Sequence, residues 1–128
     1  MATITPRQLA LLAAEVCDEK KAKDILVLDV RKITSISDYF IVCSTSNERQ
    51  ARAIAEDLRM RLKDLGKREM GVEGLEDARW VLQDFADFVL HIFHESQREF
   101  YDIEGLWADA KRVRWKTQIG RASCRERV

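Results

Sequence analysis

Apolar residues recur at intervals of three and four positions in three segments of the chain, which is the spacing of an amphipathic helix. The clearest stripe runs through residues 46–65, and Gly66 stands where a C-terminal cap is expected. An earlier helix is predicted to begin just after Thr5, because Thr5 and Gln8 have the spacing of a capping box. A last helix is expected over residues 95–113.

Between these helices lie short runs of β-branched, aromatic and aliphatic residues that have the length of strands. Strands are predicted over residues 25–30, 39–44, 79–84 and 87–93, with a minor strand in the segment that contains Gly71 and Gly74. A tight turn at Phe85 and Ala86 would make the last two strands a hairpin. Because helices and strands are interleaved and a hairpin is also present, the expected fold class is α/β: a single compact domain with a mixed β-sheet flanked by helices.

Charge is divided unevenly along the chain, although 22 basic and 22 acidic residues sum to zero. Residues 114–128 hold five basic groups and one acidic group, a net charge of +4, so residues 1–113 carry −4. We therefore expect one domain over residues 1–113 and a basic tail over 114–128. This tail is a disordered arm, an extension of the last helix that fades out or, over residues 119–128, not native to the protein. An acidic body argues against direct, sequence-specific binding of nucleic acid.

Composition also narrows the cellular setting. The longest apolar runs are far shorter than the roughly 20 residues of a membrane span, and the N-terminus lacks the pattern of a signal peptide. Cys17, Cys43 and Cys124 are widely spaced, so neither a disulfide framework nor a zinc site is expected. A reducing cytoplasm is the predicted location, with no membrane association.

Two groups of polar residues could carry chemistry, and each also has a structural explanation. His91 and His94 lie close to Glu95, but the two imidazoles of a strand at this spacing point to opposite faces, so no metal site is predicted. Asp84 and Asp87 could hold Mg²⁺ for phosphoryl transfer. Aspartate is also a common turn residue, and no phosphate-binding loop accompanies the pair.

A third candidate is the segment 44–47, which follows a strand and begins a helix. Backbone amides at such a helix start can bind an anion. Thr45 and Glu48 have the spacing of a capping box, however, and capping alone explains these residues. The residues therefore predict no catalytic group and no cofactor.

The aromatic residues point instead to a protein partner. Alternation places Trp80, Leu82 and Asp84 on one face of their strand, while their neighbours face the other way. If the Trp80 face is open, it could form an aromatic patch with Tyr101 of the last helix. Trp, Tyr and Arg dominate interface hot spots. Arg98, one turn before Tyr101, could pair with an acidic partner or with the carboxylate four residues further on.

The alternative is that these aromatic residues belong to the hydrophobic core. That is the expectation for Phe100 and Trp107, which lie on the apolar face of the last helix. For Trp80 and Tyr101 both interpretations remain open.

Five motifs occur in a fixed order along the chain: SDYFIV (37–42), GVEG (71–74), WVLQD (80–84), DFVLHIF (87–93) and REFYDIEGLW (98–107). Together they resemble the ribosomal silencing factor family, RsfS, also called the Iojap or YbeB family, over about residues 7–113. One departure is Ala86, because the family usually has glycine between the two aspartates. Alanine is compatible with this position if its φ angle is negative.

The resemblance implies a fold distantly similar to nucleotidyltransferases, without enzyme activity and without a cofactor. It implies binding to protein fourteen of the large ribosomal subunit, exclusion of the small subunit and repression of translation, together with a role in large-subunit assembly. It also implies a homodimer when the protein is free. The contact residues that it implies are Trp80 and Tyr101, with Asp84, Arg98 and Leu106 as neighbours.

Two other functions remain compatible with the residues. One is a Mg²⁺-dependent enzyme similar to nucleotidyltransferases, which would use Asp84 and Asp87. The other is a dimeric scaffold whose aromatic patch is only the interface between two copies. Loss of large-subunit binding in Trp80→Ala would favour the ribosomal interpretation over both.

Overall fold

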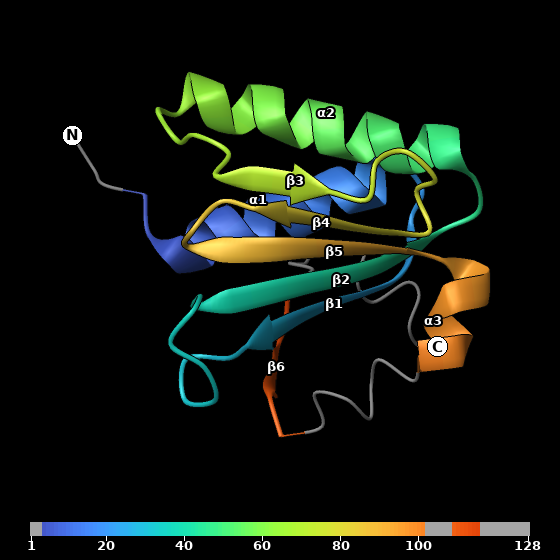
Figure 1. Ribbon diagram of the computed structural model, residues 1–128. Helices are drawn as coiled ribbons and strands as arrows, with labels where there is room; N and C mark the ends of the chain where they lie inside the picture. Colours follow the sequence, from blue (N-terminus) through green and yellow to red (C-terminus); the bar gives the residue numbers. More distant parts are fainter. Residues whose placement is uncertain (1–3, 102–108, 116–128) are drawn as a thin grey trace, which may run out of the picture.

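Six strands of the described residues form one mixed sheet in the order β3-β4-β5-β2-β1-β6 (Figure 1). The computed structural model describes residues 4–101 and 109–115, with the side chains of residues 99–101 excepted. The elements in chain order are α1 (Pro6–Glu19), β1 (Lys23–Asp29), β2 (Tyr39–Thr45), α2 (Glu48–Asp64), β3 (Gly71–Glu73), β4 (Trp80–Asp84), β5 (Phe88–His94), α3 (Glu95–Tyr101) and β6 (Lys111–Val113). Only β2 and β5 pair in parallel, and the other four pairs are antiparallel. The predicted α/β class with a mixed sheet is confirmed.

The main core lies between the sheet and the two long helices, α1 and α2, which occupy the same side of the sheet (Figure 1). We call this side the helix face. Its largest fully buried side chains are Phe88, Leu9, Ile41, Ile54, Leu58, Leu62, Leu90 and Ile92. Cys17 and Cys43 are also buried there as free thiols, and a hydrogen bond to Cys43 together with burial raises the pKa of Cys17. Most of the hydrophobic stabilisation therefore belongs to this face.

A smaller cluster covers the other side of the sheet, which we call the open face. Leu28, Val30, Val42, Phe93 and Ala110 are buried in it. Leu26, Phe40 and Trp80 pack against the cluster while keeping part of their surface exposed. Because α1 and α2 both lie on the helix face, neither covers these side chains.

Local hydrogen bonds explain where the two long helices begin and end. Thr5 and Gln8 form the predicted capping box at the start of α1. At α2 the cap is Asn47, whose side chain accepts from the Gln50 N–H at 2.8 Å, so the prediction of a cap at Thr45 is wrong by two residues. The physical reason is that Thr45 still pairs with β5 as the last residue of β2.

The end of α2 is the Schellman motif that its glycine predicts. Gly66 has a φ of +80° and donates to the Lys63 carbonyl, and Lys67 donates to the Leu62 carbonyl at 2.8 Å. Glycine adopts this left-handed conformation without the steric cost of a Cβ atom.

The C-terminal part of the domain differs from the prediction of one helix over residues 95–113. The described residues form a helix over Glu95–Tyr101 and a strand at Lys111–Val113, so the last part of the predicted helix is wrong. Residues 102–108, on which its middle part falls, lie outside the described residues. The strand forms because β1 offers an edge, with which β6 pairs antiparallel. Trp115 also packs against the main core and donates to the Ile25 carbonyl at 3.4 Å.

The β4–β5 hairpin turns sharply at Ala86, which has a φ of +74°. The condition under which alanine would be compatible with this position, a negative φ, is therefore not met. Asp87 N–H donates to the Phe85 carbonyl at 2.8 Å across Ala86, a three-residue turn that is strained for an L-residue. The Asp84 carboxylate accepts from the Ala86 N–H at 2.8 Å and holds the turn.

Candidate functional site

Trp80 begins β4 on the open face and is the centre of an aromatic cluster. Its indole lies 4.8 Å from the Phe93 ring, measured between centroids, with the planes inclined by 31°. Its Nε1–H donates to Nδ1 of His91 at 3.3 Å. His91 in turn meets the Phe40 ring edge-on at 4.9 Å. The cluster therefore spans β4, β5 and β2, which are adjacent strands of the sheet.

The register of β4 and β5 accounts for this grouping. Trp80 is paired with Phe93 and Leu82 with His91, and paired residues of neighbouring strands project to the same face. The alternate residues of β4, Val81 and Gln83, are fully buried on the helix face. The predicted division of β4 into two faces is thus confirmed.

A hollow of about 310 Å³ lies beside the indole, lined by Glu73, Gly74, Trp80 and Leu82. Gly74 makes this approach of β3 to β4 possible. A Cβ atom on Gly74 would lie 2.1 Å from the carbonyl oxygen of Trp80, and its φ of +86° also disfavours any other residue. The GVEG motif therefore has a structural role in shaping the surface around Trp80.

Arg98 is buried, with 7% of its surface exposed. Its guanidinium donates through Nη1 to Ser44 Oγ at 2.7 Å and through Nη2 to the carbonyl of Asp24 at 2.8 Å. Asp24 has a φ of +51° and lies where the β1–β2 register shifts. Arg98 thus joins α3 to β2 and β1, and no local pattern in the sequence indicates these internal partners.

The structure describes the remaining predicted contact residues to different extents. Asp84 is partly exposed at the end of β4, on the same face as Trp80, and its carboxylate caps the hairpin turn. Tyr101 is the last residue of α3, but its side chain is not described. Leu106 lies outside the described residues altogether.

The cluster contains residues that sequence reasoning did not assign to the site: Leu82, His91, Phe40 and Phe93. His91 is 4% exposed, and burial lowers its pKa to about 4. The imidazole is therefore neutral at physiological pH. Alternation alone puts His91 and Phe93 on one face, but only the pairing register brings that face beside Trp80.

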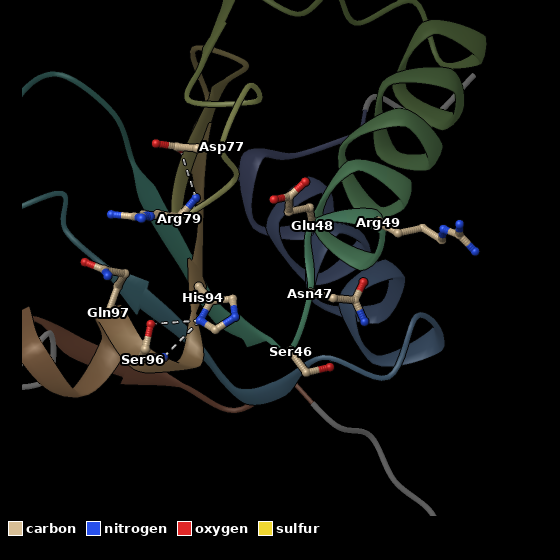
Figure 2. A pocket seen from close by; sticks show the side chains of 9 residues that line it. All are labelled: Ser46, Asn47, Glu48, Arg49, Asp77, Arg79, His94, Ser96 and Gln97. Atoms are coloured by element: carbon tan, nitrogen blue, oxygen red, sulfur yellow. Dashed lines mark hydrogen bonds between the residues drawn. The ribbon is translucent and has the colours of Figure 1, made fainter.

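A larger open pocket, of about 830 Å³, lies at the ends of β2 and β5, where α2 and α3 begin (Figure 2). It is lined by Ser46, Asn47, Glu48, Arg49, Asp77, Arg79, His94, Ser96 and Gln97. Figure 2 shows the guanidinium groups of Arg49 and Arg79 pointing to opposite sides, with Glu48 between them. Cations that diverge around a carboxylate do not form a cradle for a phosphate group.

The two aspartates of the enzyme alternative lie at the other end of the sheet. Asp84 pairs with Val89 near the start of β5, whereas the pocket borders His94 at its end. Asp87 lies 3.9 Å from Lys67 Nζ, measured from Oδ2. Among residues 4–101 and 109–115, no three His, Cys, Asp or Glu side chains are grouped to hold a metal ion. The carboxylates and the pocket therefore do not combine into one site.

Comparison with known proteins identifies the family to which the chain belongs. A family model described as "Ribosomal silencing factor during starvation" matches residues 3–127. The chain is 39% identical over 104 residues to the ribosomal silencing factor RsfS of Bacillus subtilis, covering 81% of this chain and 88% of that protein. The chain belongs to the RsfS family.

Solved structures agree with this assignment. A Chromobacterium violaceum crystal structure has a TM-score of 0.77 and 34% identity to this chain, covering 93% of this chain and 97% of that one. A Bacillus halodurans crystal structure has a TM-score of 0.74 at 36% identity, covering 84% and 98%. RsfS membership supports ribosome silencing as the role of the chain, and proteins so named are regulators rather than enzymes. Within the described residues, no helix is both long and apolar enough to cross a membrane.

Proposed function

We propose that this RsfS-family protein binds protein fourteen of the large ribosomal subunit and blocks joining of the small subunit, so that translation is repressed. The observation that carries the proposal is the partly exposed indole of Trp80, which lies on the sheet beside a hollow and against the Phe93 ring. A large aromatic side chain at the edge of a cavity is typical of an interface hot spot.

Charge favours a basic partner at this surface. Glu73 lines the hollow beside Trp80, and Asp84 lies on the same face of β4. Residues 1–113 as a whole carry a net charge of −4, which suits docking on a basic ribosomal protein rather than on RNA alone. Acidic groups at the rim would mainly increase the rate of association and orient the partner.

The contact set is proposed as Trp80 with Tyr101, supported by Asp84 and Leu106. Arg98 belongs to this set indirectly, because its hydrogen bonds to Ser44 and the Asp24 carbonyl attach α3 to the sheet. We further propose that the free protein is a cytoplasmic homodimer and that it also acts late in assembly of the large subunit.

The test is binding of purified large subunits by Trp80→Ala, measured by co-sedimentation, together with an assay of subunit joining. Loss of a hot-spot side chain costs at least about 2 kcal/mol, so binding should weaken about 30-fold. Met60→Ala is the matched control, because Met60 is 50% exposed but lies on α2, which covers the other face. Unchanged binding by a folded Trp80→Ala protein would remove Trp80 as the anchor. Failure of the unmodified protein to inhibit joining would overturn the function itself.

A further inference from the structure

The indole N–H of Trp80 donates a hydrogen bond to a buried acceptor, His91. Nδ1 of His91 accepts the indole N–H at 3.3 Å, and His91 is only 4% exposed. The Phe93 ring also contacts the indole, with centroids 4.8 Å apart and the planes inclined by 31°. The hydrogen bond is directional, so it favours the orientation in which the N–H edge of the ring points toward His91.

The acceptor role requires one protonation state of His91. An imidazole whose Nδ1 accepts carries its proton on Nε2, since the imidazolium ion has N–H groups at both positions and cannot accept. Burial lowers the pKa of His91 to about 4, which keeps the ring neutral near pH 7. Near pH 7 the neutral ring can therefore accept at Nδ1, in the tautomer that carries its proton on Nε2.

His91 is itself held firmly. It lies in the middle of β5, which is paired with β4 on one side and β2 on the other. The Phe40 ring meets it at 68° with centroids 4.9 Å apart, and Leu82 is its cross-strand neighbour. A group fixed on a central strand can determine the orientation of a side chain at the surface.

We propose that His91 is a positioning residue for Trp80: by accepting the indole N–H, it fixes the ring in the orientation that the docking partner meets. This inference rests on the proposed role of Trp80 as the anchor. Without the acceptor, the indole would turn its N–H toward water, and binding would then have to order a ring that the protein now holds in place. Ordering one such side chain weakens binding about three- to tenfold.

Two substitutions of His91 that have similar shapes separate the effect of the hydrogen-bond acceptor from the effect of losing the imidazole ring. His91→Asn can place its amide oxygen near the position of Nδ1, whereas His91→Leu has the same branched shape and no polar atom. Both remove the ring contact with Phe40 equally. The indole N–H resonance of Trp80, assigned through Trp80→Phe, reports the hydrogen bond by its chemical shift and its hydrogen-exchange rate in the free protein. Co-sedimentation with large subunits then measures the consequence for binding.

We expect His91→Leu to shift the indole resonance, speed its exchange and weaken binding three- to tenfold, with His91→Asn close to the unmodified protein in all three. Equal weakening in both variants would overturn the inference, because the acceptor would then be irrelevant. Unchanged binding in His91→Leu beside weak binding in Trp80→Ala would overturn the positioning role while leaving the anchor intact. Unchanged binding in Trp80→Ala would instead overturn the proposed function, and the positioning role with it.

Discussion

The two faces of the sheet are built from the same strands but differ in composition and burial. On β4, Val81 is fully buried against the helices, while Trp80 beside it is partly exposed on the other face. The helix face is mainly aliphatic and is covered by α1 and α2. The open face combines aromatic rings with a histidine and a carboxylate.

This difference separates what stabilises the protein from what it can offer a partner. Period-two alternation lets one strand supply the core with one set of side chains and the surface with the other. The backbone of these surface residues belongs to strands that the core holds in place. Three substitutions and one change of pH test this separation, from the largest expected change in stability to the smallest.

Phe88→Ala should be the most damaging substitution. Phe88 is fully buried on the helix face, where its ring stacks on Phe85 at 5.1 Å, and removing such a side chain costs about 3–5 kcal/mol. The control is Leu82→Ala on the open face, where only partial burial is lost and about 1 kcal/mol is expected. Urea denaturation measures both. Similar losses at the two positions would contradict the division between the faces.

Acid should destabilise the protein through the open face. The pKa of His91 is about 4 in the folded protein against an ordinary value of 6.5, so the unfolded chain binds the proton more readily. Stability should therefore fall as the pH drops from about 6.5 to 4, by about 3 kcal/mol in all. The free energy of unfolding at pH 7 and pH 4.5 measures this loss. The difference should narrow in His91→Asn, and an unchanged pH dependence would show that His91 does not titrate in this way.

Gly74→Ala should disturb the surface around Trp80 through the backbone. The added Cβ would lie 2.1 Å from the Trp80 carbonyl oxygen, and the φ of +86° is unfavourable for alanine. We expect a loss of about 2 kcal/mol, measured by urea denaturation, together with weaker large-subunit binding. Gly71→Ala is the matched control, because a Cβ there has no atom within 4 Å. An equal loss in both variants would show that the close approach at Gly74 is unimportant.

Much of the fold follows from local pattern. The two long helices, the start of α3, the five longer or glycine-flanked strands and the cap at Thr5 could be predicted because each depends on residues close in sequence. The face of β4 that carries Trp80 followed from alternation for the same reason. β6 could not be predicted in this way. Three residues carry too little periodicity, and that strand exists because β1 offers an edge to pair with.

The site was less predictable than the fold, because its contacts join distant positions. Arg98 resembled a surface residue, yet its partners Ser44 and Asp24 lie 54 and 74 positions away in sequence. His91 resembled an ordinary strand histidine until the register placed it beneath Trp80, 11 positions earlier. Side chains that act through such contacts become visible only when the strand pairing is known.

Ala86→Gly should produce the smallest change, and a favourable one. The φ of +74° destabilises the folded protein by about 1–2 kcal/mol when the residue is alanine, and glycine removes this strain. Glycine also loses more chain entropy on folding, which offsets part of the gain, so the free energy of unfolding should rise by about 0.5–1 kcal/mol. Ala78→Gly provides the comparison. Ala78 also has a positive φ of +54°, but its methyl group is buried in the main core, so the gain should largely disappear.

Thermal unfolding of both variants distinguishes relief of backbone strain from a general effect of glycine. Ala86 is exposed and lies at the turn between β4 and β5, outside the core on either face. Its substitution should therefore raise stability while leaving large-subunit binding unchanged, whereas Trp80→Ala should weaken binding. A change in binding by Ala86→Gly would mean that docking depends on this turn, where the Asp84 carboxylate accepts from the Ala86 N–H.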